Sequence, residues 1–203
     1  MIIKVCGITN LGDALDAIEL GVDVLGFNFF PDSPRFITPA DAAAIVEEIP
    51  DAIVKVGVFV NAPEEYVRQV TQLVGLDKLQ FHGDETPYYC EQFATPHWKA
   101  FRLESEKTLA LMSHFRPEYF LIDAHVEKIW GGSGVTANWD LAAAAKKLGR
   151  LILAGGLNVR NIEAAIATVK PDGIDVNSGV EDAPGQKNRF KLEEFLRKVR
   201  ESI

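Results

Sequence analysis

The sequence predicts an α/β fold, a single closed (β/α)8 barrel of minimal length. Short apolar runs alternate with segments of helical periodicity, eight of each along the 203 residues. Such alternation indicates a parallel sheet covered by helices, and eight units suit a closed barrel, whose size range begins near about 200 residues. No linker or low-complexity segment divides the chain, so one domain is expected over 1–203. A doubly wound open sheet is the alternative that this pattern leaves open.

The predicted strands are short runs rich in valine, isoleucine and phenylalanine, residues that favour β-structure. The run IVKVGVFV is the clearest of them. In chain order, the expected strands are 2–8, 22–30, 53–60, 77–83, 97–103, 118–124, 150–156 and 173–179.

The predicted helices have apolar residues three and four positions apart, and several begin at a capping residue. Thr38 is expected to cap one helix, with Pro39 in its first turn, and Asn61 is expected to cap the next. The segment 106–114 is short, so a loop is nearly as well supported there as a helix. In chain order, the expected helices are 10–21, 39–49, 63–75, 86–94, 106–114, 138–149, 159–169 and 188–203.

The composition predicts a globular protein in a reduced, cytoplasmic environment. The net charge of −8 disfavours binding to nucleic acid, whose phosphates need basic patches. No apolar run approaches the roughly 18 residues of a membrane span, and Lys4 interrupts the N-terminal run, which argues against a signal peptide. The two cysteines, Cys6 and Cys90, do not form the framework of a disulfide-rich secreted protein.

Side chains that can do chemistry follow the ends of the predicted strands. In a barrel, these ends and the loops after them form the active-site mouth. The residues found there are Cys6, Arg35, His82, Asp123 and Asp175. Each has a structural explanation on its own: a strand cysteine is usually a small buried hydrophobe, and Arg35 could be a solvated loop charge. Separate structural causes would scatter these residues over both ends of the barrel, so their convergence favours a functional site.

Glycines end the seventh and eighth predicted strands, in AGGLN and NSGVE. Glycine turns that lead toward helices offer free N–H groups, and this corner is the usual phosphate site of such barrels. Gly155, Gly156, Ser178 and Gly179 are therefore expected to bind the phosphate of a small molecule. The histidines are dispersed, and no HExxH, CxxC or GxGxxG motif occurs. The sequence thus predicts acid–base chemistry with no metal and no cofactor.

Segments along the whole chain resemble phosphoribosylanthranilate isomerase, an enzyme family of tryptophan biosynthesis. The segments are KVCGIT, GFNFFPDSPR, VGVFVN, LQFHGDE, the Asp123 segment with GGSG, ILAGGLN and DVNSGVEDAPGQKN. Two small departures occur: GGSG stands where threonine often fills the third place, and Asn177 stands where serine is common. Neither departure affects a residue expected to be catalytic.

The resemblance implies an Amadori rearrangement of N-(5-phosphoribosyl)anthranilate to 1-(2-carboxyphenylamino)-1-deoxyribulose 5-phosphate. It also implies that Asp123 is the general acid, which protonates the furanose ring oxygen, and that Cys6 is the general base, which removes the proton from C2. Arg35 would hold the anthranilate carboxylate, because a planar guanidinium suits that group. His82 and Asp175 would line the site.

These roles place opposite demands on the acid and the base. Asp123 has to be protonated, which burial or a nearby negative charge would favour. Cys6 needs a lowered pKa, because a free thiol is mostly protonated at neutral pH. Lys4 has the strand parity of Cys6 and should also point into the barrel, where it either favours the thiolate or, as the preferred interpretation, pairs with Asp175. Cys90 is expected to be inert packing.

Alternative functions and two oligomeric states remain open. A histidine-pathway isomerase of related fold uses a carboxylate where Cys6 stands, so the cysteine disfavours that function. A phosphosugar epimerase would need metal-binding histidines on its strands. A non-catalytic barrel that senses a phosphorylated ligand is the alternative from another class. The sequence is compatible with a monomer and with a homodimer.

Overall fold

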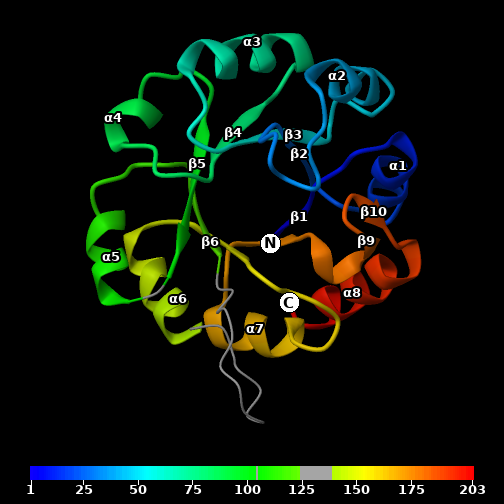
Figure 1. Ribbon diagram of the computed structural model, residues 1–203. Coiled ribbons are helices and arrows are strands. Elements are labelled where there is room, and N and C mark those ends of the chain that lie inside the picture. Colours follow the sequence, from blue (N-terminus) through cyan, green and yellow to red (C-terminus); the bar gives the residue numbers. More distant parts are fainter. Residues whose placement is uncertain (104, 124–138) are drawn as a thin grey trace.

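Eight parallel strands close into a barrel in the computed structural model, which describes residues 1–103, 105–123 and 139–203 (Figure 1). Neighbouring strands follow the chain order, and β1 pairs with β8 to close the barrel. The predicted barrel is confirmed and the open sheet is excluded. The strands are β1 (Ile2–Cys6), β2 (Val24–Asn28), β3 (Val54–Phe59), β4 (Lys78–Phe81), β5 (His97–Arg102), β6 (Tyr119–Asp123), β7 (Leu151–Ala154) and β8 (Gly173–Val176).

Helices surround the barrel as an outer ring (Figure 1). The segment 106–114, for which the sequence supports a loop nearly as well as a helix, contains a helix, α5. No helix in the described part of the chain is long and apolar enough to cross a membrane. The helices are α1 (Leu11–Glu19), α2 (Pro39–Glu47), α3 (Glu64–Val74), α4 (Pro87–Cys90), α5 (Glu106–Met112), α6 (Trp139–Ala145), α7 (Ile162–Val169) and α8 (Arg189–Glu201).

One of the two expected helix caps is confirmed and the other is wrong. Thr38 Oγ1 accepts a hydrogen bond from Asp41 N at 3.1 Å, with proline at the start of α2. Asn61 does not cap α3, which begins after Pro63 without a side-chain cap. Instead Asn61 has a φ of +49°, a left-handed conformation that asparagine tolerates, and its side chain turns away from the helix. Its Oδ1 accepts from Asp84 N at 2.7 Å.

Side chains on the strands alternate between the barrel interior and the layer under the helices. The inner cluster consists of Val24, Val56, Trp98, Ala100, Tyr119, Leu121, Ile152 and Ala154. Alternate residues of a strand face the same way, and by this alternation Cys6, Asp123 and Asp175 all point into the barrel. His82, one residue beyond the end of β4, continues the inward row through Gln80. The alternation of the strands therefore brings these four side chains to one end of the barrel interior.

A short antiparallel hairpin lies between β8 and α8, where the sequence predicted no strand. It consists of β9 (Glu181–Ala183) and β10 (Gln186–Lys187). The expected strand 173–179 ends at Val176, and a 3-10 turn over Ser178–Val180 follows it. Because these strands are so short, they have no alternation that a sequence pattern could reveal. The hairpin matters because it presents two charged residues to the mouth of the barrel.

Candidate active site

The expected site residues converge on the carboxyl end of the barrel. Cys6 and Asp123 are the last residues of β1 and β6. The charges of Asp123 and Asp175 both act on the pKa of His82, so these three side chains share one site. Arg35, on the β2–α2 loop, packs beside the backbone that follows Cys6: a Cβ built on Gly7 would lie 2.7 Å from Arg35 Cδ.

Lys4 and Asp175 form a buried ion pair between β1 and β8, as the sequence analysis preferred. Lys4 Nζ lies 2.8 Å from Asp175 Oδ2, and the Lys4 side chain is 0% exposed. Gly26 of β2 faces this pair, because a Cβ there would lie 2.9 Å from both Lys4 Nζ and Cys6 Sγ. Gly26 thus leaves the space in which the ammonium reaches the thiol. The second oxygen, Asp175 Oδ1, is buried and has no hydrogen-bond partner in the described part of the chain.

The thiol of Cys6 is protonated in the free protein. Burial raises the pKa of Cys6 and Asp175 adds to the rise, while the ammonium groups of Lys4 and Lys187 act in the opposite direction without overcoming burial. The expectation of a lowered pKa is therefore wrong for this state, because Cys6 is more buried than a residue at an open mouth. Burial also opposes the charge of Lys4, but the carboxylate of Asp175, joined by the Cys6 thiolate once that thiol ionises, outweighs burial and raises the pKa of Lys4.

His82 is a neutral imidazole held by Gln80, the preceding inward-facing residue at the end of β4. Its Nδ1 lies 2.9 Å from Gln80 Nε2. Burial lowers the pKa of His82; Lys4 and Lys99 lower it further, and Asp123 and Asp175 act against them. The ring therefore offers a hydrogen bond at the mouth without a charge.

Arg35 is oriented by a carboxylate of the hairpin, which the sequence analysis did not single out. Arg35 Nε lies 3.0 Å from both carboxylate oxygens of Glu181, and Nη2 lies 2.6 Å from Oε2. Lys187 Nζ bonds Glu181 Oε1 at 2.7 Å and Asn177 Oδ1 at 2.8 Å. Burial would raise the pKa of Glu181, but Arg35 and Lys187 outweigh it and lower that pKa. Two cations around one anion leave a net positive charge, and Arg35 Nη1 has no hydrogen-bond partner among the described residues.

Glu181 and Lys187 lie within DVNSGVEDAPGQKN, a segment that the sequence analysis quoted without giving either residue a role. A carboxylate in a loop that follows a proposed phosphate motif is a natural partner for a nearby arginine or lysine, although no spacing rule says which cation it meets.

The four residues of the expected phosphate corner lie on two loops that touch each other. Gly155 and Gly156 have φ values of +87° and +66°, which favour glycine. A Cβ on Gly179 would lie 1.9 Å from Leu157 O, so only glycine allows the two loops this approach. Ser178 begins the 3-10 turn beside them. The helix α7 begins at Ile162, five residues beyond the turn that ends at Gly156 and Leu157.

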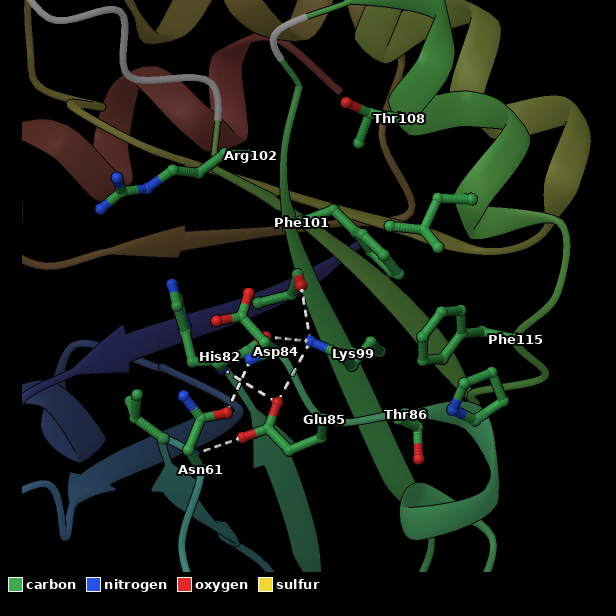
Figure 2. A pocket seen from close by; sticks show the side chains of 15 residues that line it. Asn61, His82, Asp84, Glu85, Thr86, Lys99, Phe101, Arg102, Thr108 and Phe115 are labelled. Atoms are coloured by element: carbon green, nitrogen blue, oxygen red, sulfur yellow. Dashed lines mark hydrogen bonds and ion pairs between the residues drawn. The ribbon is translucent and has the colours of Figure 1, made fainter.

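A pocket of about 600 Å³ opens beside His82, between the ends of β4 and β5 and the helix α5 (Figure 2). Lys99 lies at its base, and Phe101 and Phe115 form an apolar wall. Within the part of the chain that the structure describes, no group of three or more histidine, cysteine or carboxylate side chains could hold a metal ion.

A closed barrel with a thiol, carboxylates, an imidazole and a guanidinium at its carboxyl mouth defines a (β/α)8-barrel enzyme of the acid–base class. Residues 3–198 match the family described as N-(5'phosphoribosyl)anthranilate (PRA) isomerase. The chain belongs to this family of isomerases.

Relatives cover the whole chain. N-(5'-phosphoribosyl)anthranilate isomerase of Geobacter sulfurreducens is 46% identical over 198 residues, which are 98% of each chain. The crystal structure of phosphoribosyl anthranilate isomerase from Thermotoga maritima is similar with a TM-score of 0.92 and 37% identity, over 99% of this chain and 100% of that one. A crystal structure of this isomerase in complex with reduced 1-(o-carboxyphenylamino)-1-deoxyribulose 5-phosphate is similar with a TM-score of 0.89 and 36% identity, over 99% of this chain and 100% of that one.

Proposed function

We propose that the chain catalyses the Amadori rearrangement of N-(5-phosphoribosyl)anthranilate in tryptophan biosynthesis, with Asp123 as general acid and Cys6 as general base. The observation that carries the assignment is the position of these two side chains, which end β1 and β6 with the same inward parity. Two strands, β7 and β8, separate β6 from β1 on the shorter way round the barrel. An acid and a base so spaced can act on different atoms of one sugar.

The first step opens the furanose ring. Asp123 gives its proton to the ring oxygen as the bond from that oxygen to C1 breaks. The lone pair of the anthranilate nitrogen forms the C1–N double bond, so the product is a Schiff base. Asp123 is then a carboxylate, and the departing oxygen is a hydroxyl rather than an alkoxide, which is a poor leaving group.

In the second step Cys6 removes the proton from C2. The electron pair of the C2–H bond forms a C1–C2 double bond, and the C1–N pair returns to nitrogen, which gives an enolamine. The enolamine tautomerises to the ketone. Since the Cys6 thiol is protonated in the free protein, it must ionise in the complex, and the ammonium groups of Lys4 and Lys187 favour the thiolate.

Binding is divided among three parts of the mouth. Arg35 receives the anthranilate carboxylate along the edge that carries Nη1, since Glu181 occupies the other edge. Asp175 Oδ1 accepts a hydrogen bond from a sugar hydroxyl, and the neutral ring of His82 forms another with the sugar. Backbone N–H groups of the loops with Gly155, Gly156, Ser178 and Gly179 bind the phosphate.

The same proposal bears on the location of the protein. A biosynthetic role on a small phosphosugar and two unpaired thiols are consistent with a reduced, cytoplasmic enzyme. The Thermotoga maritima relative has been solved as monomers generated from a dimeric enzyme. A monomer and a homodimer are both compatible with the chain, and the mass measured by light scattering distinguishes them.

Fluorescence tests the function directly. The anthranilate substrate is fluorescent, and its signal should fall as the purified chain turns it over. Asp123→Asn should lower kcat by at least about 10²–10⁴, the usual share of a general acid or base. Binding of the substrate with no loss of signal would favour a sensor barrel, and turnover by Asp123→Asn at the unsubstituted rate would remove Asp123 from the acid role.

A further inference from the structure

A second buried ion pair stands beside the mouth, and the proposed reaction does not use it. Lys99 Nζ, from β5, lies 3.2 Å from Glu85 Oε2, on the β4–α4 loop, and each side chain is only 2% exposed. Both line the pocket next to His82 (Figure 2). Buried charges are costly unless they are paired and fully hydrogen-bonded, so the partners of this pair indicate what it holds in place.

The ammonium of Lys99 binds the backbone on both sides of His82. Its Nζ donates to the carbonyl oxygens of Phe81 at 3.3 Å and Gly83 at 2.7 Å, the residues directly before and after the histidine. It also donates to the carbonyl oxygen of Ala100 on its own strand at 3.1 Å. The backbone that carries His82 is therefore fixed to β5 at two points.

The carboxylate of Glu85 extends the same network to β3. Its Oε2 accepts from Gly83 N at 2.9 Å, and its Oε1 accepts from Asn61 N, just beyond β3, at 2.8 Å. Asn61 forms a second bond with the same loop, since its side-chain Oδ1 accepts a hydrogen bond from Asp84 N. A Cβ on Gly83 would lie 2.4 Å from that oxygen, so the loop packs here without room for a side chain. In Figure 2, Asn61 and Glu85 lie below His82, and Lys99 lies to its right, joined to Glu85 by a dashed line.

We propose that Lys99 and Glu85 are positioning residues for His82: together they fix the Phe81–Glu85 segment so that the imidazole points into the mouth. They act through backbone groups and do not touch the substrate. The inference rests on the proposed function in one respect, the role of His82 in binding the sugar.

Charge adds a second, measurable effect. The groups that face His82 come from four strands: Asp123 of β6, Lys4 of β1, Asp175 of β8 and Lys99 of β5. Burial lowers the pKa of His82 most, and the Lys99 ammonium contributes to that lowering. Removal of the Lys99 charge should therefore raise the pKa of His82, while the other facing charges stay in place.

The first experiment measures the ring itself and needs no catalysis. Lys99→Met keeps the length of the side chain and removes the charge. In protein with isotopically labelled histidine, the His82 signal is identified by its loss in His82→Asn, and its titration is followed by NMR. The pKa of His82 should rise in Lys99→Met. A titration and chemical shift identical to those of the unsubstituted protein would overturn the inference.

The matched control is Lys55→Met. Lys55 Nζ also forms an ion pair, 2.9 Å from Asp77 Oδ2, but at the amino end of β3 and away from the mouth. This variant should lose stability while the titration of His82 and kcat/KM stay unchanged. Changes of His82 in both lysine variants would show a general effect of losing an ion pair, and would count against positioning.

A double-mutant cycle separates positioning from general damage to the fold. Lys99→Met should lower kcat/KM by about 10²-fold, the usual effect of misplacing a group at a site. In the His82→Asn background the same substitution should change kcat/KM by no more than about twofold, because nothing remains to be positioned. Equal losses in the two backgrounds would overturn the inference.

If Lys99→Met does not fold, Glu85→Gln carries the same cycle, since its amide can accept only one of the two backbone N–H groups that the carboxylate accepts. The two proposals fail separately. If His82→Asn alone leaves kcat/KM unchanged, the proposed role of His82 in the reaction is wrong, while the NMR titration still decides whether Lys99 and Glu85 position the ring.

Discussion

The thiols of Cys6 and Cys90 are both free and buried, but they differ in their neighbours. Burial raises the pKa of both thiols, to about 12 for Cys90, but only Cys6 lies at the mouth, where the ammonium groups of Lys4 and Lys187 act against the rise. Alkylation should therefore inactivate the enzyme with one equivalent incorporated, at Cys6. Product or inorganic phosphate should slow the reaction by occupying the mouth. Peptide mass spectrometry beside residual activity checks this, and inactivation that follows the labelling of Cys90 would contradict it.

Substitution of the same thiol tests its role as a base. Cys6→Ala should fold, since it removes one small side chain, and its kcat should fall by roughly 10²–10⁴, the usual share of a general base. Cys90→Ala is the matched control and should keep its rate. If folded Cys6→Ala turns over substrate almost as fast as the unsubstituted chain, the thiol is packing, and the base has to be sought at His82 or Asp175.

Arg35→Lys tests carboxylate recognition. Lysine cannot make the two-point contact of a guanidinium with the substrate, nor the two-point contact with Glu181 seen here. The KM for the substrate should rise with little change in kcat. Substrate analogues without the carboxylate should bind the variant and the unsubstituted chain equally well in a titration. An equal loss of affinity for both kinds of ligand would show that Arg35 does something else.

The site residues that the sequence predicted are those that strand alternation places. Asp123 and Asp175 occur on rows whose parity can be counted, so the sequence identifies them as neighbours of Cys6 at the mouth. Glu181 could not be predicted as a site residue, because its hairpin is too short to show the alternation of apolar and polar residues that marks a strand. Lys99 could not be predicted either, because a lysine inside a strand is usually a solvated charge. Only the three-dimensional contacts show that its ammonium binds the backbone on both sides of His82.

At the scale of elements, the contact between the β7–α7 loop and the β8–α8 segment can be tested. Gly179→Ala would place a Cβ 1.9 Å from Leu157 O and push the two loops apart. The KM for the substrate should rise by about tenfold or more, roughly the effect of losing one charge-assisted hydrogen bond to the phosphate. Inhibition by inorganic phosphate should weaken by a similar factor, as steady-state kinetics would show.

Gly75→Ala is the control for that prediction. Gly75 also has a positive φ, +70°, but nothing lies within 4 Å of its Cβ position. The substitution strains the backbone without a clash and should cost about 1 kcal/mol of stability, with unchanged phosphate inhibition. If both glycine variants weaken phosphate inhibition equally, backbone strain rather than the loop contact is responsible.

The elements themselves were predictable to different degrees. Strands buried on both faces and helices with an apolar stripe carry strong periodicity, so their order and number follow from the sequence. The start of α3 near Asn61 could not be predicted from the sequence. Asparagine favours both a helix cap and a left-handed turn, and its contacts with Asp84 and Glu85 decide between the two. Local preference cannot include such contacts between segments.

At the scale of the whole molecule, buried groups with raised pKa values predict a loss of stability in alkali. The folded chain holds the Cys90 proton to about pH 12, whereas the unfolded chain releases it near the ordinary value of 9.0. As pH rises above 9, the unfolded state ionises first and is favoured. By pH 10 this one group should remove about 1.4 kcal/mol from the free energy of unfolding. Lys4 adds a loss at still higher pH, because its folded pKa is also raised.

Urea unfolding at pH 7 and pH 10 measures this loss. Cys90→Ala provides the comparison, since it lacks the titrating thiol. Its free energy of unfolding should decline between the two pH values by about 1.4 kcal/mol less than that of the unsubstituted chain. An identical decline in the two proteins would show that Cys90 ionises equally in the folded and unfolded states.

The ion pair of Lys4 with Asp175 joins residues 171 positions apart, on the first and last strands of the barrel. During synthesis, Lys4 leaves the ribosome early, while its carboxylate partner is still untranslated. An ammonium enclosed in a partial barrel without that carboxylate would be an unpaired buried charge, which is strongly unfavourable. The nascent chain therefore does not enclose β1 as the folded protein does until Asp175 has been translated, and the surroundings of Cys6 are completed only after that point.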